Sequence, residues 1–268
     1  MGEQTILLVH FGTSRIDVLK KALWAIERET RAAYPDWEVR GAFANKILLQ
    51  ILQQRGIPLQ LAPEALDALK DEGCRRIIIQ PTYVVRGGEY EKLQSLAEQY
   101  RRHFVQLVVG RPLLFSTEDI QEICCFCAGK FPRKVEEALV LMGHGASHSA
   151  GIIYETMSSL ISEMGFERIF LGVMEGSPDI SVVRRALKRS AVRKVILAPL
   201  LLTAGGHAAK DMAGDGPNSW KSLLQSDGYE VETVMRGLGE YPEVRARYLK
   251  HIRDAISRLA GDVDIGTA

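Results

Sequence analysis

The sequence lacks the features that mark several large classes of protein. No apolar run approaches the roughly 20 residues that a membrane-spanning helix needs. The formal net charge is only +1 over 268 residues, so no strong positive field attracts nucleic acid or an anionic membrane. No basic segment precedes the first strand-like run, so no signal peptide is visible. These absences predict a cytoplasmic protein that binds neither nucleic acid nor a membrane.

Several common motifs are also missing. Without G-x-G-x-x-G or G-x-x-x-x-G-K-[ST], dinucleotide-binding and P-loop proteins are excluded. The G-x-S-x-G elbow of the usual esterases is absent as well. Of only four cysteines, three crowd together at Cys124, Cys125 and Cys127, closer than in zinc or iron–sulfur frameworks. We interpret them as buried thiols on one apolar helix, with a redox or cluster role as the alternative.

What the chain does contain is a regular alternation of short apolar runs and amphipathic stretches. Predicted strands cover 5–10, 38–44, 76–81 and 106–109 in the first half, and 138–142, 168–173, 194–200 and 230–234 in the second. Helical patterns between them include 16–33, 90–103, 149–164 and 178–189. Such alternation is typical of parallel sheets covered on both faces. The sequence therefore predicts an α/β fold of two similar doubly wound domains, each a four-stranded parallel sheet flanked by helices, with a cleft between them.

The domain boundary is predicted in the irregular stretch 129–134. This gives an N-terminal α/β domain over 1–130 and a C-terminal α/β domain over 131–268. The first domain carries an inserted helix at 64–70, and the closing helix at 242–259 is a candidate to pack back on that domain.

The two halves repeat each other in sequence. The matching segments are 6–14 with 140–147, and 75–89 with 193–207. The spacing from the strand-ending proline to Glu89 equals that from the corresponding proline to His207. On this alignment His10 pairs with Glu89 and His144 pairs with His207, around one shared cleft.

The second half carries a candidate metal site. Ligands of open parallel sheets lie beyond the carboxyl ends of the strands, where His144 and Glu175 are expected. His207 begins a helical stretch, whose N-terminus keeps an imidazole neutral, and Asp211 lies one turn further on the same face as an acceptor for the ring. Each residue alone could be structural, the histidines as hydrogen-bonded groups and Glu175 as a helix cap. Together they predict a two-His-one-carboxylate site that suits Zn, Fe, Co or Ni.

At these residues the chain resembles the anaerobic cobalt chelatases of vitamin B12 synthesis, the sirohydrochlorin cobaltochelatases of the class II chelatase group. The matching segments are 9–14, 143–145, 175–178, 205–215 and 219–221. The resemblance spans nearly the whole chain. It implies two similar α/β domains and an enzyme, a lyase that forms metal–nitrogen bonds by inserting Co²⁺ into sirohydrochlorin.

The resemblance also implies roles for individual residues. His144, Glu175 and His207 would bind the metal, and His144 would also accept a pyrrole proton. Glu89 would face them across the cleft. The catalytic residues are then His144, His207 and Glu89. The divalent metal ion is a co-substrate, Co²⁺ with Fe²⁺ or Ni²⁺ as further options, and no organic cofactor is implied. A homo-oligomer is left open.

The tetrapyrrole carries many carboxylates, so we expect basic groups, hydroxyls and close-approach glycines beside the motifs to bind it. The candidates are His10, Ser14, Arg86, Gly145, Gly205 and Gly206, with Thr13, Ser147 and Lys210 as further neighbours.

Other functions are compatible with the same residues. The nearest is a sirohydrochlorin or porphyrin ferrochelatase. A His₂Glu metal-dependent hydrolase should retain stoichiometric zinc and cleave an ester or amide. A non-enzymatic, two-lobed tetrapyrrole- or metal-binding protein should bind its ligand without turnover.

Overall fold

The chain forms two compact units in a computed structural model that describes residues 3–131, 133–145 and 148–261. One unit consists of the chain up to Leu113 together with the segment from Gly239 onward, and the other is Leu114–Leu238. Each unit is described by itself.

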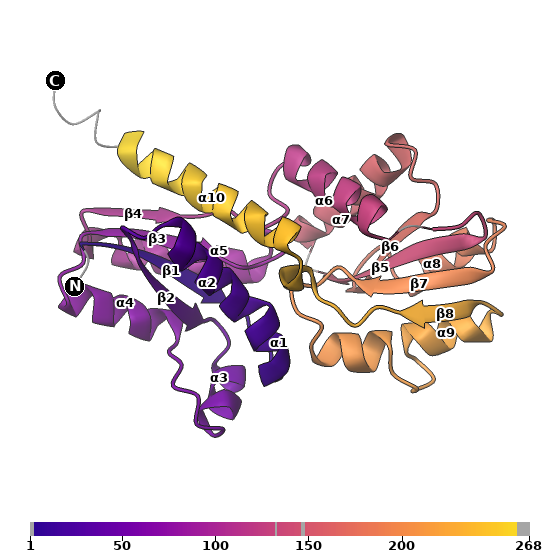
Figure 1. Ribbon diagram of the computed structural model, residues 1–268, viewed down its shortest axis with the longest axis horizontal. Coiled ribbons are helices and arrows are strands. Elements are labelled where there is room, and N and C mark those ends of the chain that lie inside the picture. The colour runs from indigo at the N-terminus through magenta and orange to yellow at the C-terminus, as the bar shows by residue number, and fades with distance from the viewer. Residues whose placement is uncertain (1–2, 132, 146–147, 262–268) are drawn as a thin grey trace. The chain divides into compact units, whose positions relative to one another are not determined.

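The first unit is built on a four-stranded parallel sheet with the strand order β2-β1-β3-β4 (Figure 1). Its strands are β1 (Gln4–His10), β2 (Glu38–Phe43), β3 (Arg76–Pro81) and β4 (Gln106–Val109). Its helices are α1 (Ile16–Lys21), α2 (Leu23–Ala33), α3 (Lys46–Gln53), α4 (Ala62–Asp71), α5 (Gly88–Tyr100), the 3₁₀ turn η1 (Arg101–His103) and α10 (Pro242–Gly261). A core cluster joins Leu7, Ile77 and Ile79 of the central strands to Leu66 of α4 and Leu93 of α5. Burial on both faces explains the continuous apolar runs.

The closing helix α10 completes the first unit. It packs on β3, β4 and α2 (Figure 1). The Tyr248 hydroxyl donates to the Tyr83 carbonyl at 3.1 Å, and the Tyr34 hydroxyl donates to the Leu249 carbonyl at 2.7 Å. The Arg245 guanidinium also meets Glu29 of α2 at 2.7 Å. The chain therefore returns to its first unit after the second is finished.

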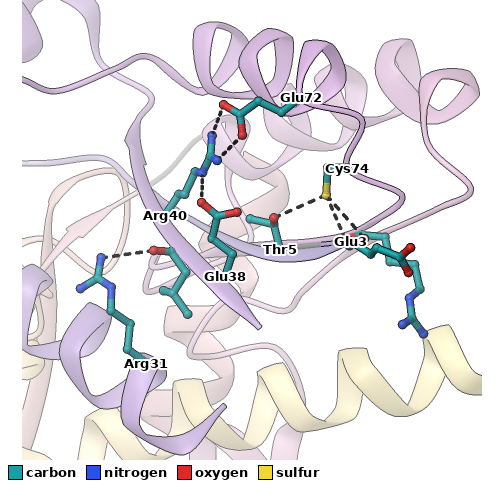
Figure 2. A network of polar contacts seen from close by, with 9 residues as sticks. Glu3, Thr5, Arg31, Glu38, Arg40, Glu72 and Cys74 are labelled. Carbon is teal, nitrogen blue, oxygen red and sulfur yellow. Dashed lines mark hydrogen bonds and ion pairs between the residues drawn. The ribbon is translucent and has the colours of Figure 1, made fainter. Parts of the chain in front are cut away.

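A polar network ties the outer edge of the first sheet to the end of α4 (Figure 2). Arg40 on the edge strand β2 donates to Glu38 at 2.7 Å and to Glu72 at 3.0 Å. The Arg40 guanidinium lowers the pKa of the Glu72 carboxyl. The buried Cys74 thiol donates to the Thr5 hydroxyl at 3.4 Å. These groups hold the inserted helix α4 at the sheet edge.

The second unit repeats the first, with strand order β6-β5-β7-β8 (Figure 1). Its strands are β5 (Glu137–Gly145), β6 (Ile169–Glu175), β7 (Lys194–Pro199) and β8 (Glu230–Thr233). Its helices are α6 (Thr117–Lys130), α7 (His148–Glu163), α8 (Ile180–Leu187), the π-helical turn η2 (Ala208–Met212) and α9 (Trp220–Ser226), and the 3₁₀ turn η3 (Leu238–Glu240) follows. The two parallel sheets confirm the predicted fold class.

The division into units differs from the boundary that the sequence predicts at residue 130. Helix α6 groups with the second unit, where it contacts α7. It begins at a capping box in which the Ser116 hydroxyl accepts from the Asp119 amide at 3.2 Å. The leucines at the crossing, Leu113 and Leu114, are both fully buried. No polar linker therefore marks the point where the chain first passes from one unit to the other.

The cysteine cluster lies on α6, as predicted. Cys124 and Cys127 are buried and Cys125 is exposed. Burial raises the pKa of the Cys124 thiol to about 12 and raises that of Cys127 as well. Such thiols carry almost no thiolate at neutral pH, so the helix holds them as small apolar core groups.

Candidate metal-binding site

Strand pairing shows how the two halves correspond. Val9 on β1 lies opposite Pro81 on β3, and Met142 on β5 lies opposite Pro199 on β7. The hydrogen bonds that follow agree, because the amides after the two prolines donate to the carbonyls of Val9 and Met142 at 2.9 and 2.8 Å. Val9 and Met142 are therefore equivalent positions.

This register corrects the sequence alignment of His10 with His144. The residue after Val9 or Met142 is His10 in the first half and Gly143 in the second, and the one after that is Phe11 or His144. Alternate side chains of a strand point to opposite faces, so a shift of one residue places His10 on the other face from His144. Phe11, which is 43% exposed, occupies the place of His144.

His10 is fully buried and both of its ring nitrogens have partners. Nδ1 lies 2.9 Å from the Thr82 hydroxyl, and Nε2 lies 3.1 Å from the Glu27 carboxylate. Burial acts to raise the pKa of Glu27, but hydrogen bonds from His10 and Arg31 lower it overall. A ring with no exposed surface does not support the predicted substrate contact. We therefore interpret His10 as part of a polar cluster in the core.

In the second unit a tyrosine fills the space that His10 occupies in the first. A Cβ on Gly143 would lie 2.7 Å from the Tyr154 ring. Tyr154 comes from α7 and is 1% exposed. Burial raises its pKa to about 12, against the opposing effect of a hydrogen bond with the Gly145 backbone. The Tyr154 phenol thus supports the strand end that carries His144.

His144 and His207 lie side by side in the second unit. Their ring centroids are 5.0 Å apart and the ring planes are nearly perpendicular, at 88°. His144 is half-buried near the end of β5, and the His207 side chain is 56% exposed. The predicted contact with Asp211 is present, with 2.8 Å between His207 Nδ1 and the carboxylate. A carboxylate that holds the Nδ1 proton leaves Nε2 as a free electron-pair donor.

Glu175 ends β6 beside the same strand end. It is paired in register with Gly145, and its side chain is exposed. Gly145 has φ +93°, and a Cβ there would lie 1.9 Å from the Glu175 carbonyl oxygen. This position therefore requires glycine for the close packing of β5 on β6, whatever its contact with a substrate.

The three predicted ligands do not converge on one point. Across residues 3–131, 133–145 and 148–261, no three His, Cys, Asp or Glu side chains are grouped so that they could hold a metal ion. The structure brings together the two imidazoles and places Glu175 on a neighbouring strand end.

The chain around His207 has an unusual conformation that sequence reasoning missed. The π-helical turn η2 follows His207 directly, with the Ala213 amide donating to the Ala208 carbonyl at 3.0 Å. Such turns occur frequently at functional sites. Of the two preceding glycines that were predicted to bind substrate, Gly205 is buried and Gly206 is exposed. Lys210 within η2 is exposed.

The remaining predicted residues lie in the first unit. Glu89 in the first turn of α5 is 40% exposed and meets Lys92 at 2.7 Å. Arg86 is exposed, Thr13 is buried, and the carbonyl of the half-buried Ser14 accepts from Arg55 at 2.7 Å. Ser147 lies outside the described residues.

Tyr83 is a polar group near Glu89 that the sequence did not single out. It is 7% exposed, and among the described residues its hydroxyl has no hydrogen-bond partner. Burial raises the pKa of Tyr83, and the Glu89 charge raises it further. Only its place two residues after the strand-ending proline could have drawn attention to it.

Two solved chelatase structures share the fold of this chain. SirB from Bacillus subtilis with Fe³⁺ matches with a TM-score of 0.67 and 15% identity, over 97% of this chain and 98% of that one. CbiX, described as the terminal enzyme of siroheme biosynthesis in denitrifying bacteria, matches with a TM-score of 0.57 and 19% identity, over 94% and 99% of the two chains. The fold is that of the class II chelatases.

Within that class the chain belongs to the cobalt chelatase (CbiK) family, which it matches over residues 4–257. It is 33% identical over 257 residues to the sirohydrochlorin cobaltochelatase of Salmonella typhimurium, covering 95% of this chain and 97% of that protein. It is 32% identical over 263 residues to the sirohydrochlorin cobaltochelatase CbiKC of Nitratidesulfovibrio vulgaris, covering 97% and 93%. Over the described part of the chain, no helix combines the length and apolar character that a membrane span requires.

Proposed function

We propose that this protein inserts Co²⁺ into sirohydrochlorin, with release of the two pyrrole N–H protons. The observation that carries the proposal is the His144–His207 pair, whose ring centroids lie 5.0 Å apart in a chain that belongs to the CbiK family. His144 stands near the end of β5 and His207 directly before η2. Relatives named sirohydrochlorin cobaltochelatase that align over nearly the whole chain support the substrate.

The second unit is proposed to hold the metal before transfer. His144 and His207 would donate ring nitrogens, and the exposed Glu175 side chain would turn toward them to supply an oxygen. Three protein ligands leave coordination positions open for pyrrole nitrogens. Such a site also releases its ion more readily than a closed four-ligand site does.

Proton removal is the second task. Each inserted ion displaces two protons from the macrocycle, and neutral imidazole or carboxylate can accept them. We assign this role to Glu89, and to His144 once its ion has passed to the macrocycle. Asp211 holds the His207 ring, at 2.8 Å, in the orientation that binding requires.

Imidazole and carboxylate bind several divalent ions, so the proposed ligand set does not itself select cobalt. Fe²⁺ and Ni²⁺ are proposed as alternative substrates. A homo-oligomer, a cytoplasmic location and the lack of an organic cofactor stay predictions.

An anaerobic assay tests the proposal. Purified protein is mixed with sirohydrochlorin and Co²⁺, Fe²⁺ or Ni²⁺, and the absorption spectrum of the tetrapyrrole is followed. We expect metal-dependent turnover, abolished or severely depressed in His144→Ala and His207→Ala, because either change removes one of the paired imidazoles. The exposed His103 in the first unit provides a matched control, His103→Ala, which should keep wild-type turnover. Undiminished turnover in both site variants, with normal circular dichroism, would show that the site is wrong.

A further inference from the structure

A polar pocket lies in the second unit, away from the paired imidazoles. It has a volume of about 360 Å³ and is lined by Arg133, Gly165, Phe166, Glu167 and Arg168, and we call it the arginine pocket. Arg168 directly precedes β6 and Arg133 precedes β5, so the pocket lies at the amino ends of these strands. His144 and Glu175 are at the carboxyl ends. Glu175 lies seven residues after Arg168 along the strand, which is roughly 23 Å at about 3.3 Å per residue.

Both guanidinium groups are anchored by neutral backbone carbonyls. Arg133 Nη1 donates to the Phe131 carbonyl at 2.7 Å. Arg168 Nη1 donates to the carbonyls of Val135 and Lys134 at 2.6 and 3.2 Å. These bonds fix the positions of the two side chains without neutralising their charge.

The positive charge of the arginine pocket has no acidic partner within the described part of the chain. Arg133 Nε is buried and, within the described part of the chain, has no hydrogen-bond partner. Burial lowers the pKa of Arg133, and the nearby Arg168 charge lowers it further. The one acidic lining residue, Glu167, is exposed, and no hydrogen bond or ion pair joins it to either arginine in the described residues. Two like charges close together are unfavourable unless an anion lies between them.

We propose that the arginine pocket binds a small tetrahedral dianion, of which inorganic phosphate is the simplest. Two guanidinium groups match two negative charges, and their forked donors suit the oxygens of a phosphate group. The volume, near the lower end of the range of about 300–1,000 Å³ for ligand pockets, favours a compact ligand. The site is separate from metal insertion and does not depend on the proposed function.

Calorimetric titration of the full chain with phosphate tests this proposal, with ionic strength held constant by chloride because salt screens exposed charges. We expect saturable binding that weakens by at least about tenfold in Arg133→Gln and in Arg168→Gln, since each variant loses a charge-assisted contact. Arg193→Gln is the matched control. Arg193 is exposed, lies just before β7 at the same end of the sheet and does not line the pocket, so the variant should bind like the wild type.

Acetate serves as the monoanionic comparator and should bind more weakly than phosphate. If Arg133→Gln does not fold, Arg133→Lys decides, because it keeps the charge but removes the planar fork of donors and should still weaken binding. The proposal is overturned by an absence of saturable phosphate binding, by equal affinity for acetate, or by an equal loss in Arg193→Gln.

Discussion

His10 and His144 lie near the ends of the equivalent central strands β1 and β5, yet their surroundings are opposite. His10 uses both ring nitrogens inside the first unit, with Thr82 and Glu27, and has no exposed surface. His144 is half-buried and meets a second imidazole, that of His207. One position along a strand separates a buried structural histidine from one that pairs with His207, because successive side chains face opposite sides.

Glu89 occupies in the first unit the place of His207 in the second, eight residues after the strand-ending proline. We expect Glu89→Gln to lower turnover about 10- to 100-fold, since the amide cannot accept a proton, while Co²⁺ affinity stays nearly unchanged. Metal affinity and turnover are measured separately, with Glu91→Gln, an exposed carboxylate in the same helix turn, as the control. Wild-type turnover in this variant would show that Glu89 has only a structural role at the start of α5. A loss of Co²⁺ affinity would show that Glu89 is a metal ligand.

At the scale of elements, the ends of β5 and β6 are held together at a position that only glycine fits. Gly145 combines φ +93° with a Cβ position 1.9 Å from the Glu175 carbonyl oxygen. We therefore expect Gly145→Ala to lower the free energy of unfolding by at least about 1–3 kcal/mol, the usual cost of such backbone strain, and to depress metal insertion by displacing both strand ends. Denaturant titration measures the first effect.

The matched control for this change is Gly151→Ala on α7, where a Cβ meets nothing within 4 Å. That variant should be neutral or more stable, because alanine is favoured over glycine in a helix by about 0.5–1 kcal/mol. Equal stability of the Gly145 variant and the wild type would show that the strand ends adjust without strain.

Strands and local helices could be predicted because their signals are local. The apolar runs of β1, β3, β5 and β7 mark strands buried on both faces. The predicted helix over 16–33 is instead two helices separated by the single residue Ala22, whose φ of −107° and ψ of −72° depart from regular helix values. No glycine or proline marks the break.

The register of the repeat was also misread from the sequence. Both halves contain a histidine shortly before a glycine, and only strand pairing shows which positions correspond.

At the scale of the whole molecule, the two units are not successive segments of the chain. The first unit takes its last helix, α10, from the far end of the sequence, and α6 joins the second unit before the stretch that suggested a boundary. Both outcomes depend on contacts between distant residues, such as Tyr248 with Tyr83 at 3.1 Å, which composition cannot reveal. The pair His207 and Asp211 could be predicted because both belong to one helical turn.

The two units share the same sheet topology but carry different side chains at equivalent positions, and this asymmetry bears on the choice of metal. Where the second unit has His144 and His207, the first has Phe11 and Glu89, so of these equivalent positions only those of the second unit pair imidazoles. Two imidazoles and a carboxylate follow the general affinity order, in which Fe²⁺ and Co²⁺ are neighbours and Ni²⁺ and Cu²⁺ bind more tightly. For the proposed ligand set we therefore expect no intrinsic specificity for cobalt, and we expect metal supply to decide which ion is inserted in the cell.

We therefore expect the isolated protein to insert Fe²⁺ into sirohydrochlorin at a rate within about one order of magnitude of that for Co²⁺, because neighbouring ions in the affinity order are held and released alike. Anaerobic assays at matched free metal concentrations measure both rates, and His207→Ala should lose both together if one site serves both ions. A protein that inserts Co²⁺ but no Fe²⁺ at any concentration would place the selectivity in the protein itself. The search would then move to the residues around the imidazole pair, beginning with η2 and the exposed Lys210 within it.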